Sequence, residues 1–385
     1  MSLVFNEDQE LLQDSAKNFV TQNAPLSVLR QLRDTNDVQG FDEKIWAHMI
    51  ELGWAGIAIE ESFGGFNFGY AGLGVVLEET GRTLVSSPLI SSVLLGATAI
   101  RYFGSDVQKN YLLPKVVNGQ LLLALAADEL PIHSPNHIES SATKVDGGYR
   151  INGNKTFVLD GHVADKLIVV AKVDKGDVRS QGLSLFVVDK KASGLNIQRT
   201  SMVDCRNCAN ISLTDVFVDE ENCLGADIDV EDGASKFARV LDVGRIGVAS
   251  EMLGSMQAAF DLTLTYLKQR EQFGVLIGSF QGLQHRAATM YSEIELCRSA
   301  VRGALLELDN LEASDDSVAR MASMTKAKLS DVAQIVSNEA IQMHGGIGMT
   351  DEFDVGFYIK RARVAQQFLG DAAFHRDRYA SLSAF

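Results

Sequence analysis

Residues 283–305, LQHRAATMYSEIELCRSAVRGAL, place apolar side chains at steps of three or four over about six helical turns. Similar stripes run through residues 252–267 and 318–336, and the methionines within them read as core residues rather than as ligands. Long helices that each carry one apolar stripe pack against one another as an antiparallel bundle. The sequence therefore predicts a C-terminal four-helix bundle over residues 229–385. The stripe of residues 283–305 consists of Leu283, Ala287, Met290, Ile294, Cys297, Val301 and Leu305.

Short strand-like segments fill residues 118–228, where the helical spacing stops. Residues 167–171 and 183–188 are strongly apolar runs, and residues 211–218 alternate between apolar and polar side chains. Asp146-Gly147-Gly148 separates two further segments and indicates a tight β-hairpin. Because no helical stretch lies between these strands, we expect a small antiparallel β-barrel or sandwich.

Helical spacing also marks residues 1–117, for example around Leu11, Phe19 and Trp46. The chain of 385 residues is too long for one ordinary core, and it contains no long Pro/Gly/Ser linker. We therefore predict an α+β multidomain protein with three parts. These are an N-terminal α-helical domain (1–117), a β-domain (118–228) and a C-terminal α-helical bundle (229–385).

The composition, with 46% hydrophobic and 22% charged residues, is ordinary for a soluble protein. No apolar run approaches the ~20 residues that span a bilayer, and the charged N-terminus lacks an apolar signal core. We expect a cytoplasmic protein without a membrane span. The net charge of −15 argues against nucleic acid as a partner, although a few local arginines suffice to bind a small phosphorylated molecule.

Cys205 and Cys208 have the spacing of a metal knuckle, but no second Cys or His pair follows nearby to complete four ligands. The pair also sits among strand-like residues rather than at the start of a helix, where a redox pair is expected. We interpret the two as unrelated thiols and predict no metal site.

Two motifs point to a family. Residues 266–281, YLKQREQFGVLIGSFQ, resemble the Arg-x-x-Phe-Gly…Gln signature of the acyl-CoA dehydrogenases. Residues 342–348, QMHGGIG, resemble their Gln-x-x-Gly-Gly-x-Gly turn, and residues 104–114 and 182–188 are similar to further segments of that family. The resemblance covers essentially the whole chain in order, and it agrees with the three-part architecture.

The resemblance implies an FAD-dependent tetrameric oxidoreductase of lipid metabolism, with an acyl-CoA substrate and an electron acceptor such as an electron-transfer flavoprotein. Arg270, Phe273 and Gln281 would then hold the adenine-pyrophosphate half of an FAD that belongs mainly to a neighbouring subunit. An arginine suits this role because it binds a pyrophosphate bidentately.

The glycine-rich turn would contact the FAD of the facing subunit through Gln342, Gly345 and Gly346. Glycines let a backbone approach a bulky cofactor closely. A plain helix C-cap is the alternative interpretation of Gly345-Gly346, and both can hold together.

Residues 241–245, LDVGR, resemble the family segment in which an aspartate and an arginine hold the pantetheine of CoA. Asp242 and Arg245 occupy these two positions. Solvation of a helix start is the alternative interpretation of both residues.

The chain departs from the family at the catalytic base. The family reaction removes a weakly acidic proton next to a thioester, which requires a positioned carboxylate. In most members this is a glutamate before Gly-Thr, and the matching position here is Leu369. In other members it lies in the Leu-Asp-x-Glu-Arg helix, and the matching position here is Gly244. Asp371 could be a displaced base, although a helix N-cap fits it better.

The β-domain also departs from the family near the flavin ring. The family's Thr-Glu-Pro loop appears as Asp128-Glu129-Leu130, and its Trp-Ile-Thr/Ser strand appears as Phe157-Val158-Leu159. Leu159 cannot donate a hydroxyl hydrogen bond to the flavin. A carboxylate at position 128 would be unfavourable near a ring that becomes anionic on reduction.

Our leading hypothesis is an acyl-CoA dehydrogenase subunit that lacks its own catalytic glutamate and works in a mixed tetramer with homologous subunits. One rival is a self-sufficient homotetrameric dehydrogenase that uses Asp371. Another is a flavin-dependent monooxygenase on the same fold, which needs no such base. A third is a non-catalytic scaffold subunit without flavin.

Overall fold

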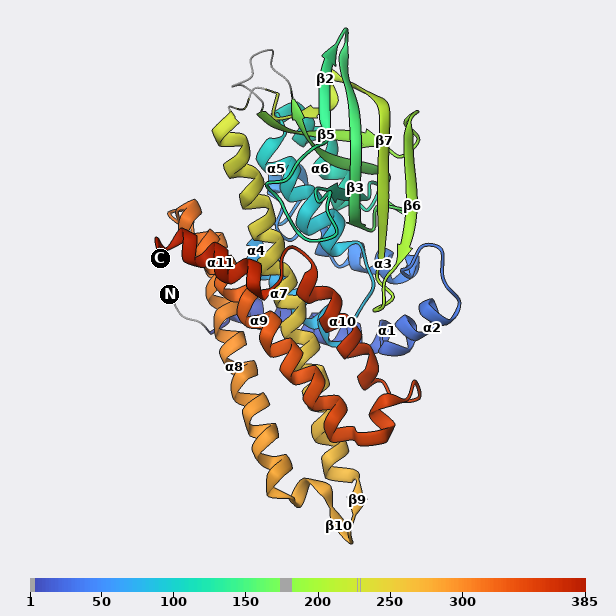
Figure 1. Ribbon diagram of the computed structural model, residues 1–385, viewed down its shortest axis with the longest axis vertical. Helices are drawn as coiled ribbons and strands as arrows, with labels where there is room; N and C mark the ends of the chain where they lie inside the picture. Colours follow the sequence, from blue (N-terminus) through green and yellow to red (C-terminus); the bar gives the residue numbers. More distant parts are fainter. Residues whose placement is uncertain (1–3, 174–181, 227, 229) are drawn as a thin grey trace. The chain divides into compact units, whose positions relative to one another are not determined.

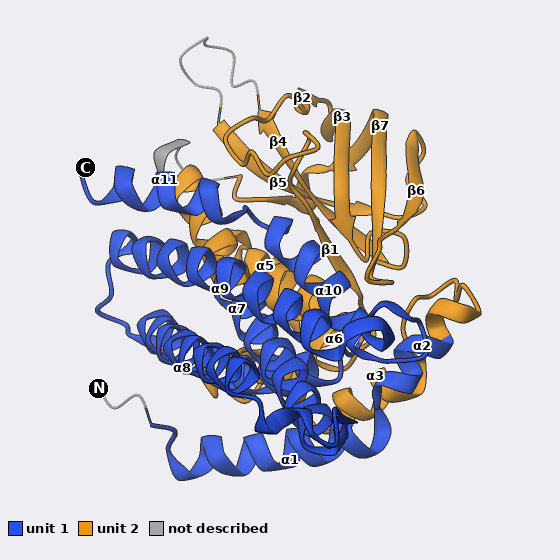
Figure 2. Cartoon of the chain, turned by 60° about the horizontal axis from the view of Figure 1, so that its bottom comes forward, with its two compact units in different colours: residues 1–31, 70–85, 245–385 blue, residues 32–69, 86–244 orange. Residues whose placement is uncertain are grey.

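The computed structural model describes residues 4–173, 182–226, 228 and 230–385, and the chain divides into two compact units (Figure 2). Unit 1 comprises residues 1–31, 70–85 and 245–385, and unit 2 comprises residues 32–69 and 86–244. The predicted domain boundaries near residues 117 and 228 stay predictions, and residue 229 lies outside the described residues.

Unit 1 is mainly helical, and its C-terminal part confirms the predicted helical bundle. In this part α9 lies against α8, α10 and α11 (Figure 1). The stripe predicted over residues 287–305 is the buried face of α8, whereas Leu283 is only partly buried. The helices are α1 (Glu7–Asn23), the start of α2 (Leu26–Asp34), α4 (Gly69–Arg82), α7 (Val230–Gln269) from Arg245 onward, α8 (Gln281–Asp309), α9 (Asp315–His344), α10 (Val355–Gln367) and α11 (Ala372–Leu382).

Two glycines let α4 and α7 cross in backbone contact. A Cβ atom on Gly81 would lie 2.1 Å from the carbonyl oxygen of Glu251, and one on Gly254 would lie 1.7 Å from that of Glu78. Ion pairs flank this crossing, between Arg298 and Glu78 at 2.6 Å and between Arg82 and Asp261 at 2.9 Å. The crossing fixes the part of α7 that follows Arg245.

Unit 2 contains a mixed β-sheet together with helices of the N-terminal region. The strands run in the order β6-β7-β3-β2-β4-β5-β8, and β1 pairs with β4 beside this path. The strands are β1 (Leu123–Ala126), β2 (Ser141–Val145), β3 (Gly148–Leu159), β4 (Lys166–Val173), β5 (Gly182–Asp189), β6 (Leu195–Ser201), β7 (Asn207–Asp219) and β8 (Cys223–Leu224). The helices are α3 (Glu43–Glu51), the π-helix Leu89–Ala97, α5 (Thr98–Phe103) and α6 (Asp106–Val117).

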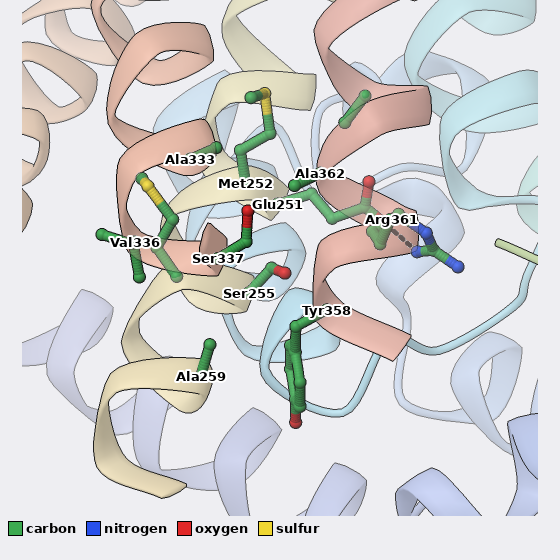
Figure 3. Close-up of a pocket in the computed structure, with 12 residues that line it drawn as sticks. Glu251, Met252, Ser255, Ala259, Ala333, Val336, Ser337, Tyr358, Arg361 and Ala362 are labelled. Atoms are coloured by element: carbon green, nitrogen blue, oxygen red, sulfur yellow. Dashed lines mark hydrogen bonds and ion pairs between the residues drawn. The ribbon is translucent and has the colours of Figure 1, made fainter. Parts of the chain in front are cut away.

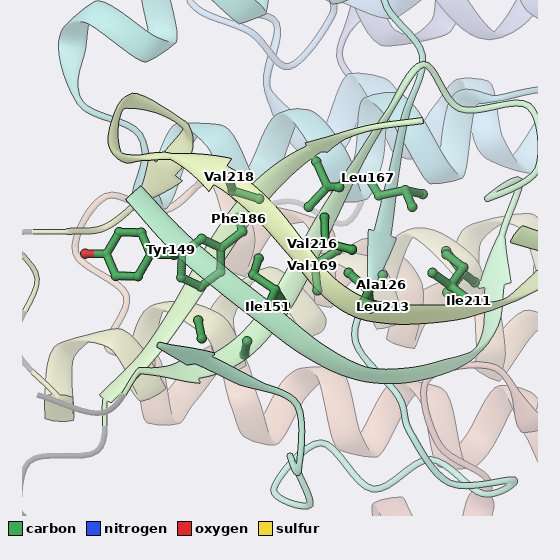
Figure 4. Close-up of a cluster of buried hydrophobic side chains, with 14 of the residues drawn as sticks. Ala126, Tyr149, Ile151, Leu167, Val169, Phe186, Ile211, Leu213, Val216 and Val218 are labelled. Atoms are coloured by element: carbon green, nitrogen blue, oxygen red, sulfur yellow. The ribbon is translucent and has the colours of Figure 1, made fainter. Parts of the chain in front are cut away.

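One apolar cluster forms the core of this sheet (Figure 4). Tyr149 of β3 meets Phe186 of β5 edge to face, with ring centroids 5.1 Å apart. The predicted hairpin at residues 146–148 joins β2 to β3, with Val145 paired to Gly148 and Gly147 at φ +76°. The sequence prediction of this turn is therefore confirmed, because only glycine adopts such a φ without strain.

The sheet corrects our expectation of an antiparallel barrel or sandwich. β4 pairs in parallel with both β1 and β2, so the sheet is mixed, and the described strands do not close into a barrel. Between β1 and β4 the chain forms the β2–β3 hairpin instead of a crossover helix, which hid the parallel pairing from a local reading. The nearly continuous apolar run of β4 is typical of a strand that is buried on both faces.

No helix in the described part of the chain combines the length and the apolar character that crossing a membrane requires. Residues 4–173, 182–226, 228 and 230–385 also contain no cluster of three or more His, Cys, Asp or Glu side chains that could hold a metal ion. Neither Cys205 nor Cys208 takes part in a disulfide, and burial raises the pKa of Cys208 to about 12. A thiol with such a pKa is not a nucleophile at neutral pH.

Candidate active site

Residues 270–281 run from the end of α7 to the first residue of α8 and contain a short β-hairpin, and we call this segment the exposed hairpin. Strands β9 (Glu271–Gln272) and β10 (Val275–Leu276) pair, and the amide of Ile277 donates to the carbonyl of Arg270 at 2.8 Å. Phe273 at the tip has φ +58° and is 92% exposed. The hairpin therefore presents an aromatic ring that the fold of this chain does not bury.

The predicted FAD residues of the exposed hairpin all face solvent. Arg270 and Gln281 are exposed, and Gln281 begins α8. The guanidinium of Arg270 makes no ion pair or hydrogen bond with any residue that the structure describes. An arginine with its five donors unused inside the chain is available to an anion from outside. The structure thus places Arg270, Phe273 and Gln281 on one short, exposed segment of the chain.

The glycine-rich turn follows the end of α9. Gly345 is the C-cap of α9, with φ +64°, and its amide donates to the carbonyls of Ile341 and Gln342. The C-cap interpretation is therefore confirmed for Gly345. Gly346 has no positive φ, and a Cβ atom there would meet nothing within 4 Å, so the fold of this chain does not require glycine at 346.

A buried histidine links the glycine-rich turn to the end of α7. The His344 ring stacks on Tyr266 at a centroid distance of 4.5 Å, and its Nδ1 lies 2.7 Å from the carbonyl oxygen of Ala340. Burial lowers the pKa of His344, so the ring is neutral at pH 7. Because the amide of Arg270 donates to the carbonyl of Tyr266 at 2.9 Å, this stack connects the glycine-rich turn to the start of the hairpin.

Leu369, which we expect to occupy the position of the family's base, lies in a turn between α10 and α11. We call residues 366–371 the carbonyl turn. Leu369 is buried and has φ +59°, a left-handed conformation that is uncommon for a leucine. Gly370 has φ +106°, and a Cβ atom there would lie 2.5 Å from Cδ1 of Phe374. The turn therefore has a strained backbone that the surrounding side chains must hold.

Three buried donors from three helices converge on the carbonyls of this turn. Nε of Arg245 donates to the carbonyl of Leu369 at 3.2 Å, and Nε2 of His375 lies 3.0 Å from the same oxygen. Nζ of Lys326 donates to the carbonyls of Gln366 at 3.1 Å and Gly370 at 2.9 Å. Arg245, His375 and Lys326 are each at most 1% exposed.

Burial changes the charge of two of these donors. It lowers the pKa of His375 to about 2, so this ring is neutral and donates from Nε2. It also lowers the pKa of Lys326 to about 7, with a further lowering by the nearby charge of Arg245 and an opposing effect of Asp371. The carbonyls of the turn are thus bound by a guanidinium, by a neutral imidazole and by an amine that is close to losing its proton at neutral pH.

Sequence reasoning missed Lys326 and His375. A signal for Lys326 was present, because residue 326 stands four after Ala322 and three before Leu329, both of which are fully buried. This spacing places residue 326 on the apolar face of α9. No comparable pattern in the sequence marks His375.

The structure places Asp371 as the N-cap of α11, where its Oδ1 accepts from the amide of Phe374 at 2.8 Å. The predicted cap is confirmed, and the role of a displaced base stays a prediction. Asp242 lies one turn before Arg245 in α7 and is 2% exposed. The predicted contact of Asp242 and Arg245 with CoA also stays a prediction.

In unit 2, the loop at residues 128–140 is tied together by its own charges. Oδ2 of Asp128 lies 2.8 Å from Nδ1 of His133, and Oε1 of Glu129 lies 2.7 Å from Nζ of the buried Lys155. Leu159 is buried in the same unit. The carboxylate of Asp128 is thus bound within its own loop, and the side chain of Leu159 is packed inside the unit. Asp128 has partners on both carboxylate oxygens, since Oδ1 accepts from the amide of Ser134 at 3.3 Å.

A small pocket lies inside unit 1 between α7, α9 and α10 (Figure 3). It contains a buried ion pair between Glu251 and Arg361, with Oε1 and Nη1 3.1 Å apart, and Ser255 and Ser337 contribute hydroxyl groups to its wall. None of the predicted site residues lines this pocket.

Comparison with known families gives three consecutive matches. The acyl-CoA dehydrogenase N-terminal domain matches residues 6–120, the middle domain residues 134–216 and the C-terminal domain residues 231–382. These matches follow the order of helices, sheet and helical bundle along the chain.

Individual proteins give the same result over nearly full length. The CarC subunit of the caffeyl-CoA reductase–Etf complex of Acetobacterium woodii is 30% identical over 94% of this chain and 94% of its own. Butyryl-CoA dehydrogenase from Megasphaera elsdenii has a TM-score of 0.88 at 26% identity and covers 100% of both chains.

A structure described as the electron transferring flavoprotein of Acidaminococcus fermentans has a TM-score of 0.87 at 29% identity, over 99% of this chain and 98% of that chain. All these similarities span the helical and sheet regions together. The chain therefore belongs to the acyl-CoA dehydrogenase family of FAD-dependent flavoprotein oxidoreductases.

Proposed function

We infer that this chain is a subunit of an acyl-CoA dehydrogenase assembly, that it lacks a base of its own, and that it completes the FAD site of a homologous subunit. The observation that carries this proposal is Leu369. At the position that matches the family's glutamate, the chain has an apolar side chain, buried in a turn that is held in place from three helices. The second family position falls on Gly244 in α7, which has no carboxylate either.

The exposed hairpin supports a role toward a neighbouring subunit. The guanidinium of Arg270 has no partner among the residues that the structure describes. Phe273 is 92% exposed, although its ring meets that of Phe280 edge to face at a centroid distance of 6.2 Å. A guanidinium and an exposed ring on the same hairpin suit a pyrophosphate joined to an adenine. Gly346 is likewise unexplained by this fold, and its open surroundings leave space for a close approach from outside. These residues fit the adenine-pyrophosphate half of FAD. When bound, FAD supplies the acceptor for a hydride from the substrate's β-carbon.

Asp371 is poorly suited to replace the missing base. Its carboxylate already accepts the amide of Phe374, and this bond holds the first turn of α11. A base must be free to take the proton of the substrate. Oδ2 of Asp371 could still take a proton in a self-sufficient homotetramer, but protonation would weaken the cap in each catalytic cycle, because a neutral carboxyl group is a poorer acceptor than a carboxylate.

We further propose an electron-transfer flavoprotein as the electron partner. The CarC relative is by description part of a reductase–Etf complex, and the Acidaminococcus structure is described as an electron transferring flavoprotein. A docked partner of this kind would take the electrons of the reduced flavin.

The test compares the purified chain alone with the chain co-expressed with a homologous subunit that keeps the glutamate. We expect acyl-CoA to bleach the flavin absorbance only in the mixed assembly. Bleaching by the chain alone would overturn the mixed-assembly proposal and support the homotetramer, with Asp371→Asn as the decisive variant. Oxygen consumption with an added flavin reductase would indicate a monooxygenase. Absence of flavin from both preparations would leave a scaffold subunit.

A further inference from the structure

The burial of Lys326 is unfavourable in free energy and calls for an explanation. Its ammonium group is completely buried, and among the described residues it bonds to two backbone carbonyls and to the hydroxyl of Ser330 rather than to a carboxylate. Burying a charged amine without an ion pair is unfavourable, and an apolar side chain of similar volume would serve the stability of α9 at least as well. The lysine therefore needs another reason.

The acceptors of Lys326 supply that reason. The carbonyls of Gln366 and Gly370 flank Leu369, so one amine bridges the two sides of the strained residue. Arg245 and His375 hold the carbonyl of Leu369 itself, but both donate to the same oxygen. Lys326 is thus the donor that ties the end of α10 to the residue after Leu369.

We propose that Lys326 is a positioning residue that fixes the carbonyl turn and thereby the place of the side chain at position 369. The statement that position 369 borders the acyl-CoA site rests on the proposed function, whereas the hold on the turn does not. Lys326 touches neither substrate nor cofactor in this role. It acts through the backbone of residues 366–370.

The test measures amide hydrogen exchange of the full-length chain over residues 366–376. Lys326→Met keeps the length of the side chain and removes its donors, and we expect exchange at the Gly370 amide to rise about tenfold because two buried bonds are lost. Lys326→Arg keeps donors and charge and should restore most of the protection. Lys328→Met is the matched control, because Lys328 stands two residues later in α9 and pairs with Glu293 of α8. It should leave the carbonyl turn unchanged.

Unchanged exchange of the turn in Lys326→Met would overturn the proposal, and so would an equal rise throughout α8 and α9, which indicates a general loss of packing. If Lys326→Met does not fold, Lys326→Gln, which keeps one donor, is measured in the same way and should give a rise of about threefold. No rise in that variant would again overturn the proposal.

A second measurement separates this proposal from the proposed function. An acyl-CoA thioester is added to the wild-type assembly, and exchange in the turn is followed. If the thioester changes nothing there while Lys326→Met still raises exchange, Lys326 positions the turn but the turn does not border an acyl-CoA site. Slower exchange with the thioester in wild type, together with weaker thioester binding in Lys326→Met, is the result expected if both proposals hold.

Discussion

At the exposed hairpin, the side chains of Arg270 and Phe273 face solvent, whereas at the carbonyl turn three buried side chains bind backbone oxygens of the chain itself. The two regions belong to the same helical unit. One region is held by buried side chains of the same chain, and the other leaves its charged and aromatic groups exposed. Under the proposed function, the exposed groups would serve a neighbouring subunit, while the chain itself holds the turn around Leu369.

Gly370→Ala and Gly346→Ala test the contrast with the same chemical change. At position 370 the new methyl group needs a left-handed φ and collides with Phe374, so we expect a loss of about 3 kcal/mol in the free energy of unfolding. At position 346 the expected loss is below about 0.5 kcal/mol, because no atom stands nearby. Denaturant unfolding of both variants measures the difference. Equal losses would remove the distinction between the two regions.

Arg270→Ala should act on cofactor binding and leave the isolated chain as stable as before. We expect FAD in the mixed assembly to bind roughly 100-fold more weakly, as for the loss of a charged contact to a phosphate. The control is Lys268→Ala, an exposed cation two residues earlier at the end of α7. Flavin retained on gel filtration and thermal unfolding are the two readouts. A fall in thermal stability without loss of flavin would mean that Arg270 serves the fold.

The buried His375 predicts an acid dependence of stability. Its pKa is about 2 in the folded chain against an ordinary value of 6.5. Between these two pH values the unfolded chain therefore binds a proton at His375 that the folded chain does not bind. Above pH 6.5 this group does not reduce the free energy of unfolding. As pH falls from 6.5 toward 2, the free energy of unfolding decreases with a slope approaching ~1.4 kcal/mol per pH unit. His375→Gln keeps a donor for the carbonyl of Leu369 but cannot titrate. Urea unfolding between pH 7 and pH 4 should show a smaller slope in this variant.

Asp371→Asn has the smallest expected effect. Asparagine also caps helices, so the free energy of unfolding should change by less than about 0.5 kcal/mol, while Asp371→Ala should cost about 1 kcal/mol. Neither variant should reduce dehydrogenation by the mixed assembly by more than threefold. A large drop in turnover in Asp371→Asn, with its stability unchanged, would identify Asp371 as a base and overturn the proposed role of this chain.

The helical stripes and the hairpin at residues 146–148 could be predicted because each depends on neighbours in sequence. The spacing of Met290, Ile294 and Cys297 fixes one face of a helix, and Gly147 provides a φ that other residues avoid. The parallel pairing of β1 with β4 could not be predicted in this way, because it joins residues about forty positions apart. Local spacing carries no information on such partners.

Motif positions were available for the site, but the local environment of each residue was not. The family signature led to Arg270 and Gly345, and the structure adds that one is exposed and the other caps α9. The grouping of Arg245, Lys326 and His375 depends on the packing of α7, α9 and α11 around a single turn. A charged residue is ordinarily expected at the surface, so the burial of Lys326 ran against the usual inference.

The carbonyl turn has a consequence for how such a chain could arise. Its shape depends on bonds to main-chain oxygens, which every amino acid carries, and not on the side chain at position 369. If position 369 is the family's base position, as we propose, one copy of a duplicated gene can exchange its glutamate for leucine without losing the scaffold around it. The two copies can then divide the chemistry between them while their protein backbones stay alike, and a single further exchange at 369 would return a carboxylate to a turn that is already built.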